Sequence, residues 1–193
     1  MRGAVPFEWG LLAFGEEGLA LLSAEGIRRL DSCCGHEPDV TAATTGSGFV
    51  YVAAEDGLEV YSTRLRRLCK VEMEPAHALA RNADVLVSAC RAGLEIFRIT
   101  DPRRPRRTES VRLEGVTDLV VPIVGQGKSL LVTTRAGISK LFDFSGGDDP
   151  SLLATYPRLP WFAHAARLGG LLLRLTDDRG GIEIGYFGKA RVF

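Results

Sequence analysis

Residues 85–97, with the sequence VLVSACRAGLEIF, contain the pattern that determines the fold. An apolar segment is followed by a short turn, by Gly93, and by a second segment in which side chains of different character alternate. Alternation with a period of two is typical of a β-strand, and glycine takes the positive φ angle of a tight turn without steric cost. The segment therefore predicts a β-hairpin. An Ala-rich helix over residues 74–97 is the competing interpretation, although the apolar residues there do not follow a helical period.

The same hairpin pattern occurs five times in the 193 residues, and its glycines are 39, 36, 44 and 44 residues apart. Further short apolar segments before and after each hairpin complete four strands per repeat. Repeats of about 40 residues with four strands each are the sequence signature of β-propeller blades. The five copies are LLAFGEEGLALL (11–22), FVYVAAEDGLEVY (49–61), VLVSACRAGLEIF (85–97), LLVTTRAGISKL (130–141) and LLLRLTDDRGGIEIG (171–185).

A ring of such sheets is favoured over an open row, because an open row would leave two apolar faces in water. We therefore expect an all-β protein, a five-bladed β-propeller built from five four-stranded antiparallel repeats. A half-propeller that closes by dimerisation is the alternative. The expected blades of this single domain, residues 1–193, span residues 1–34, 38–74, 76–114, 117–157 and 163–193.

Residues 93–113, GLEIFRITDPRRPRRTESVRL, resemble the LVIVD-type repeat of β-propellers, a WD40-like repeat. In that repeat a Gly-Leu-x-Ile strand leads into an Asp-Pro-x-x-Pro turn and then into the outer strand. The resemblance implies a propeller that serves as an interaction platform and shares no catalytic signature. The matching residues are Gly93, Leu94 and Ile96 in the strand and Asp101, Pro102 and Pro105 in the turn.

The composition is that of a folded protein, with 46% hydrophobic residues and 24 basic side chains balanced by 24 acidic ones. No apolar run approaches the roughly 18 residues of a membrane-spanning helix, and Glu8, Glu16 and Glu17 interrupt the apolar N-terminal segment. We expect a cytoplasmic protein without membrane contact. The four cysteines do not have a zinc-binding spacing, so we expect free thiols, with a disulfide as the alternative.

Known catalytic and cofactor-binding motifs are missing from the sequence. It contains no P-loop, no dinucleotide-type glycine motif, no HExxH and no GxSxG. We therefore expect a protein that is not an enzyme and that holds no cofactor.

Four polar residues precede the glycines of the second to fifth repeats by similar distances: Asp39, His77, Asp118 and His164. We expect each to lie at the start of the first strand of its blade, so that together they form a ring at one mouth of the central channel. Two imidazoles and two carboxylates are competent metal ligands, and a His–Asp pair would suit acid–base chemistry in a metal-dependent, hydrolase-like enzyme. The same residues would also satisfy backbone groups between blades. We favour this structural role and expect no metal.

Arginines gather in the segments that follow the third strand of the first three repeats, where nine of them would form an arc on one face of the ring. The hairpin turns on the opposite face are acidic in three repeats. The arc suits an acidic protein surface, because arginine pairs well with carboxylate and phosphate. Trp161 and Phe162 would form a second contact point or seal the ring. Besides Arg28 and Arg29, the candidate partner-binding residues are Arg64, Arg66, Arg67, Arg103, Arg104, Arg106, Arg107, Trp161 and Phe162.

The sequence thus predicts a non-enzymatic protein–protein interaction scaffold with another protein as its partner. The alternatives are a polyanion- or nucleic-acid-binding protein that uses the arginines, and the metal-dependent enzyme described above. The sequence does not identify the partner, the cellular process or the oligomeric state, nor whether the channel holds a ligand.

Overall fold

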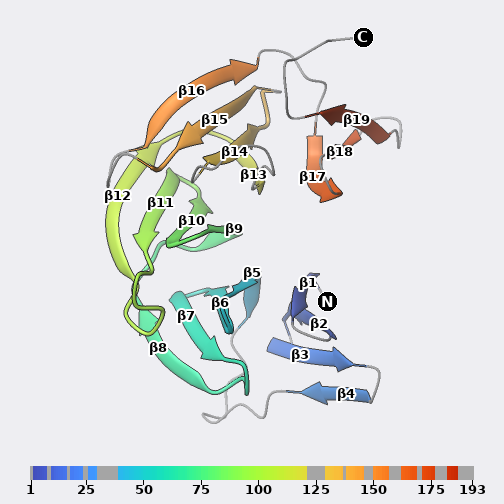
Figure 1. Ribbon diagram of the computed structural model, residues 1–193, viewed down its shortest axis with the longest axis vertical. Coiled ribbons are helices and arrows are strands. Elements are labelled where there is room, and N and C mark those ends of the chain that lie inside the picture. The colour runs from blue at the N-terminus through green and yellow to red at the C-terminus, as the bar shows by residue number, and fades with distance from the viewer. Residues whose placement is uncertain are drawn as a thin grey trace.

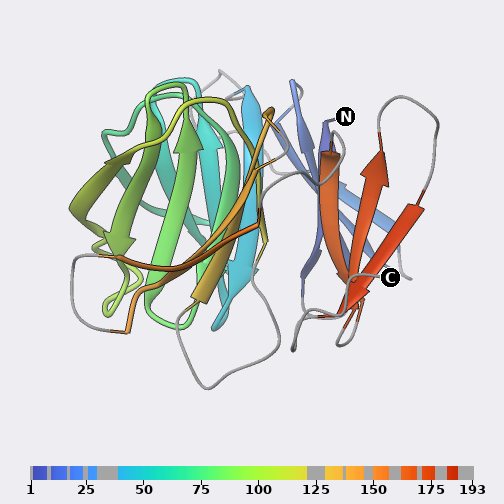
Figure 2. The ribbon, with the colours of Figure 1, turned by 90° about the horizontal axis from the view of Figure 1, so that it is seen from above.

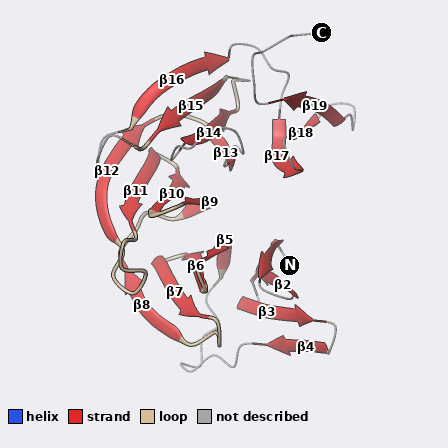
Figure 3. Ribbon diagram, in the orientation of Figure 1, coloured by secondary structure: helices blue, strands red, loops and turns tan. Residues whose placement is uncertain are grey.

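The computed structural model is built from β-strands (Figure 1). It contains no helix in the part of the chain that it describes (Figure 3), and strands β9 (Ala76–Asn82), β10 (Val85–Cys90) and β11 (Gly93–Arg98) occupy the segment for which a helix was the alternative. The prediction of an all-β protein is confirmed, and the helical interpretation is excluded. The described residues are 2–7, 10–16, 18–23, 26–29, 39–120, 129–136, 138–145, 150–156, 162–168, 171–176 and 182–186.

The described strands form five antiparallel sheets, four with four strands and the last with three. In each sheet neighbours in sequence are neighbours in space, as tight hairpins require. We number the sheets in chain order: first (β1–β4), second (β5–β8), third (β9–β12), fourth (β13–β16) and fifth (β17–β19). The fourth strand expected for the fifth repeat lies outside the described residues.

The bounds of the other strands are β1 (Gly3–Phe7), β2 (Gly10–Gly15), β3 (Gly18–Ser23), β4 (Gly26–Arg29), β5 (Val40–Gly46), β6 (Phe49–Ala54), β7 (Gly57–Ser62), β8 (Arg67–Val71), β12 (Arg106–Arg112), β13 (Val116–Val120), β14 (Ser129–Thr134), β15 (Ser139–Asp143), β16 (Ser151–Tyr156), β17 (Phe162–Leu168), β18 (Leu171–Thr176) and β19 (Ile182–Tyr186).

The sheets follow one another around a common centre, with the first strand of each sheet innermost (Figure 1). The inner strands are in contact in series, from β1 to β5, β9, β13 and β17. Seen from above, the strands of neighbouring sheets run side by side (Figure 2).

The core consists of three apolar clusters, each of them between two consecutive sheets. We call the face of a sheet that points to the preceding sheet its leading face, and the opposite face its trailing face. Along the second strand of each sheet, successive residues alternate between these faces. The third residue of the second strand in one sheet therefore shares a cluster with the second residue of the second strand in the next sheet. These pairs are Leu12 with Val50, Tyr51 with Leu86, and Val87 with Leu130.

The hairpin glycine of the third sheet is required by close packing as well as by its backbone angle. Gly93 has a φ of 141°, and a Cβ there would lie 2.1 Å from the carbonyl oxygen of Val111 in β12. We expect Gly93→Ala to lower the free energy of unfolding by at least about 2 kcal/mol, because the two outer strands would have to separate.

Denaturant unfolding measures this loss, with Gly48→Ala as the control. Gly48 also has a positive φ, 77°, but the nearest atom to its added Cβ is 3.5 Å away. The control is expected to cost about 1 kcal/mol. Equal losses in the two variants would contradict the close packing at Gly93.

Candidate functional site

The four polar residues expected to form one ring occupy three different positions in the sheet register. In the second to fifth sheets the first strand contains a β-bulge, that is, one extra residue without a partner in the second strand. The bulge lies opposite the last two residues of the second strand. His77 is itself a bulge residue, Asp118 and His164 each follow one, and Asp39 precedes β5. The expected equivalence of the four residues is therefore wrong, because a one-residue bulge changes the register. The equivalent bulge residues are Thr41, His77, Thr117 and Ala163.

The bulge residues of the second and third sheets hold the next sheet in place. The Thr41 hydroxyl donates a hydrogen bond to the carbonyl oxygen of Ala76 at the start of β9. The Nε2 atom of His77 donates in the same way to the carbonyl oxygen of Val116 at the start of β13, over 2.9 Å. Each bond joins the inner strands of two consecutive sheets. Thr41 and His77 therefore each satisfy a backbone carbonyl of the following sheet.

Asp39 pairs with an arginine of the first sheet instead of with the other candidates. The guanidinium of Arg2 donates to its carboxylate over 2.8 Å. Within the described residues, no group of three or more His, Cys, Asp or Glu side chains is placed to hold a metal ion. The side chains of Asp118 and His164 lie outside the described part of the structure.

Two buried glutamates, which the sequence analysis missed, form matching ion pairs in the second and third sheets. Glu59 is 2% exposed and Glu95 is 4% exposed. The guanidinium of Arg67 lies 3.0 Å from the Glu59 carboxylate, and that of Arg107 lies 2.7 Å from the Glu95 carboxylate. Each pair joins the third strand of a sheet to its outer strand. A buried carboxylate requires such a partner, because burying it alone is costly.

A second β-bulge brings each arginine to its glutamate. Between β7 and β8 and between β11 and β12 the register shifts by one residue, at Leu68 and at Thr108. Because successive strand residues point to opposite faces, this shift moves the arginine to the face of the glutamate. A repeated Gly-Leu-Glu sequence at the start of the third strand, followed by arginine in the outer strand, is the signal that identifies such pairs.

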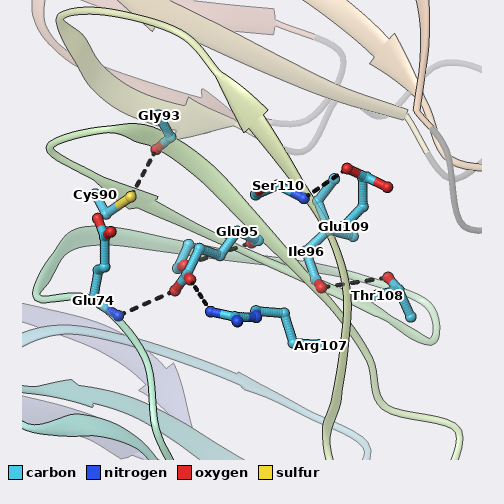
Figure 4. Close-up of polar contacts among 10 residues, drawn as sticks. Glu74, Cys90, Gly93, Glu95, Ile96, Arg107, Thr108, Glu109 and Ser110 are labelled. Carbon is cyan, nitrogen blue, oxygen red and sulfur yellow. Dashed lines mark hydrogen bonds and ion pairs between the residues drawn. The ribbon is translucent and has the colours of Figure 1, made fainter.

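Glu95 also fixes the connection between the second and third sheets (Figure 4). Its second carboxylate oxygen accepts a hydrogen bond of 3.2 Å from the backbone N–H of Glu74, which precedes β9. In the second sheet the corresponding oxygen of Glu59 accepts from the hydroxyl of Tyr61. The carboxylates therefore use both oxygens within the chain.

These pairs divide the arginines that were expected to bind a partner. Arg67 and Arg107 are neutralised by glutamates of their own sheets. Of the other seven, five have described side chains; these five are exposed, and none of their guanidiniums has an ion-pair partner within the described residues. These five, which we call the arginine rim, are Arg64, Arg66, Arg103, Arg104 and Arg106.

The arginine rim spans two neighbouring sheets at the same end of their strands. Arg64 and Arg66 lie between β7 and β8, while Arg103 and Arg104 lie between β11 and β12. The connection between β11 and β12 lies beside β8 (Figure 1). In agreement with this, burial and then the nearby Asp101 carboxylate raise the pKa of the Cys69 thiol in β8.

The remaining candidates differ from expectation or lie outside the described residues. Arg28 and Arg29 belong to strand β4 rather than to a turn, and their side chains are not described. Phe162 begins β17, and its side chain is likewise not described, whereas Trp161 lies outside the described residues altogether.

The opposite ends of the strands carry both signs of charge. The turn between β6 and β7 contains Glu55 and Asp56, and a hydrogen bond from Lys70 lowers the pKa of Asp56. The corresponding turns of the third and fourth sheets contain exposed Arg91 and Arg135. Arg91 and Arg135 are exposed but lie at the opposite ends of the strands, so they can serve as control positions for substitutions in the arginine rim.

A cavity of about 420 Å³ adjoins the Glu95–Arg107 pair. Its other polar groups include Glu74 and the Cys90 thiol, which donates to the carbonyl oxygen of Gly93 over 3.4 Å (Figure 4). Burial, followed by the Glu74 carboxylate, raises the pKa of Cys90, which disfavours the nucleophilic thiolate.

Comparison with known proteins identifies the fold and no more. Neither a known protein family nor a curated protein matches the chain. Among solved structures, BamB from Moraxella catarrhalis superposes on 98% of the chain with a TM-score of 0.71 and 15% identity. Raptor from Chaetomium thermophilum superposes on 98% of the chain with a TM-score of 0.70 and 16% identity. BBS1N, from its complex with ARL6DN, superposes on 94% of the chain with a TM-score of 0.69 and 16% identity.

The fold is of the β-propeller class. The chain spans 58% of the BamB chain, 61% of the BBS1N chain and 20% of the Raptor chain. In the part of the chain that the structure describes, no helix is both long and apolar enough to cross a membrane.

The two partners of a buried ion pair are expected to differ in the cost of their removal. Arg107→Leu leaves a carboxylate in the core without its guanidinium, whereas Glu95→Leu leaves an arginine whose side chain is 57% exposed and remains hydrated. We expect Arg107→Leu to lower the free energy of unfolding by about 2 kcal/mol, and Glu95→Leu to lower it by less. Denaturant titration of both variants measures the difference. The reverse order would show that the carboxylate is solvated in the folded protein.

Proposed function

We propose that the five sheets are blades of one LVIVD-like propeller domain, and that the domain is a non-enzymatic interaction module for an acidic protein surface. The observation that carries this proposal is the arginine rim. Five exposed guanidiniums lie on two adjacent sheets, and the described residues neutralise none of them. Because arginine forms paired hydrogen bonds with carboxylates, such a rim is suited to an acidic partner.

The arrangement of the charges supports docking over a purely structural role. The two arginines that stabilise the sheets are paired with Glu59 and Glu95. The rim arginines have no such role, so their concentration at one end of two sheets is left for a partner. Charge of one sign on a surface steers an oppositely charged partner towards it.

Similar structures agree with a protein partner. The BBS1N structure is a complex with ARL6DN, although at 16% identity the likeness concerns the fold alone. The proposed setting is the cytoplasm, and the free thiols of Cys69 and Cys90 fit its reducing conditions.

A charge-reversal variant tests the proposal. Arg103→Glu, Arg104→Glu and Arg106→Glu together should abolish capture of the partner from an extract of the native source, because the rim would then repel an acidic surface. Partners captured by the unaltered protein and by the variant are compared by quantitative mass spectrometry. The fold is checked by circular dichroism.

The matched control reverses Arg91 and Arg135, which are exposed at the opposite ends of the strands. This control should capture the same partner as the unaltered protein. Equal loss in both variants would reject the arginine rim as the site. Capture that disappears after nuclease treatment would identify a nucleic acid as the ligand instead of a protein.

A further inference from the structure

The cavity of about 420 Å³ lies on the leading face of the third sheet, near the turn between β10 and β11. Residues that are directly opposite each other in antiparallel strands point to the same face of the sheet. One such row contains Glu95 and Ser110, and the next row towards the turn contains Gly93 and Arg112. Glu74, from the connection that precedes β9, lines the same space. The walls of the cavity therefore come from three strands and from the connection between two sheets.

The cavity exists because the residue opposite Glu95 is small. In the second sheet the residue opposite Glu59 is Lys70, whose long side chain extends to the Asp56 carboxylate in the turn between β6 and β7. Ser110 occupies the corresponding position of the third sheet, opposite Glu95, and contributes only a short hydroxyl side chain. The third sheet thus has an open space where the second sheet has an ion pair.

The buried carboxylate at the inner wall of the cavity is less fully bonded than its counterpart in the second sheet. There the second oxygen of Glu59 accepts a hydrogen bond from the Tyr61 hydroxyl. Phe97 occupies that position in the third sheet and has no hydroxyl to donate. The second oxygen of Glu95 accepts a bond of 3.2 Å from the backbone N–H of Glu74, at the long end of the usual range. Because a carboxylate oxygen has two lone pairs, this oxygen can accept a further donor from the cavity.

Three of the five charged side chains that line the cavity are engaged within the third sheet. Glu95 and Arg107 neutralise each other. The carboxylate of Glu109 accepts a hydrogen bond of 3.0 Å from the backbone N–H of the next residue. The two that remain are Glu74 and Arg112, which are exposed and have opposite charges.

Glu74 and Arg112 line the same cavity without contacting each other. The Glu74 carboxylate lies beside the Cys90 thiol (Figure 4), and neither Glu74 nor Arg112 forms an ion pair in the described part of the chain. Opposite charges on either side of an open space are complementary to a molecule that carries both charges. A volume of about 420 Å³ accommodates a small molecule, since such sites measure roughly 300–1,000 Å³.

We propose that this cavity binds a small zwitterion of the amino-acid class. Its ammonium group donates to the carboxylate of Glu74 and to the second oxygen of Glu95, and its carboxylate accepts from the guanidinium of Arg112. Hydrogen bonds between charged groups are stronger than those between neutral groups, and only a molecule with both charges satisfies both sides. The site is independent of the acidic partner proposed above, because none of these residues belongs to the arginine rim.

An NMR titration that follows the backbone amides tests the site. The probes are ω-amino acids of increasing length, namely glycine, β-alanine, γ-aminobutyrate and ε-aminocaproate, because the separation of their two charges differs. At least one probe should shift the amide signals of Gly93 and Ser110. It should bind at least about tenfold more tightly than the amine or the carboxylic acid of the same length, each of which forms only half of the contacts. Absence of binding by all four probes would overturn the inference, and so would equal binding by the amine alone.

Substitutions of the two charged residues assign the contacts. Glu74→Gln and Arg112→Gln should each weaken binding at least about tenfold, since each removes one charged partner. The matched controls are Glu72→Gln and Arg91→Gln, because both residues are exposed nearby and neither lines the cavity. The controls should leave the Kd unchanged. Equal weakening in the controls would show unspecific attraction between charges and would overturn the site.

A third substitution fills the cavity without removing a charged residue. Ser110→Lys reproduces the arrangement of the second sheet and should abolish binding of every probe, while circular dichroism shows an intact fold. Thr155→Lys, at the corresponding exposed position of the fourth sheet, is the control and should bind as the unaltered protein does. Binding that survives Ser110→Lys would contradict the inference. Partner capture by the arginine rim should be the same in all these variants, so the failure of one proposal is distinguishable from the failure of the other.

Discussion

The sheets of this chain carry apolar side chains on both faces, and the burial of both faces is the constraint on which the rest of the structure depends. Tyr51 and Val50 are neighbours in β6, and both are fully buried, one towards the third sheet and the other towards the first. A single sheet cannot bury both of its own faces, because it is only one layer thick. Successive sheets must therefore pack face to face, and their twist leads them around a common centre.

Within this stack, β-bulges decide where polar groups go. The bulges of the inner strands direct Thr41 and His77 towards the next sheet, where they satisfy backbone carbonyls. The bulges of the outer strands bring Arg67 and Arg107 to buried glutamates. His77, Arg67 and Arg107, which the sequence presents as candidate functional residues, therefore make structural contacts. The arginine rim has no internal role among the described residues, and it is the site that we propose for a partner.

The repeat and its hairpins could be predicted from the sequence because they depend on local features, namely alternation and a glycine such as Gly93 at a positive φ. The register could not, since a single extra residue in a strand leaves no mark on the hydrophobic pattern. His77 and Asp118 therefore seemed equivalent although they differ by one position. Alternation alone places Glu95 and Phe97 on one face of β11, but the pairing of Glu95 with Arg107 depends on the bulge at Thr108.

Hydrogen exchange of the backbone amides tests the face-to-face packing most directly. If neighbouring sheets stabilise one another, the amides of β6 and β10, which have a sheet packed on each face, should exchange slowest and open together in denaturant. The outer strands β12 and β16 should exchange much faster. Outer strands as protected as β6 and β10, or sheets that open independently of their neighbours, would contradict the account.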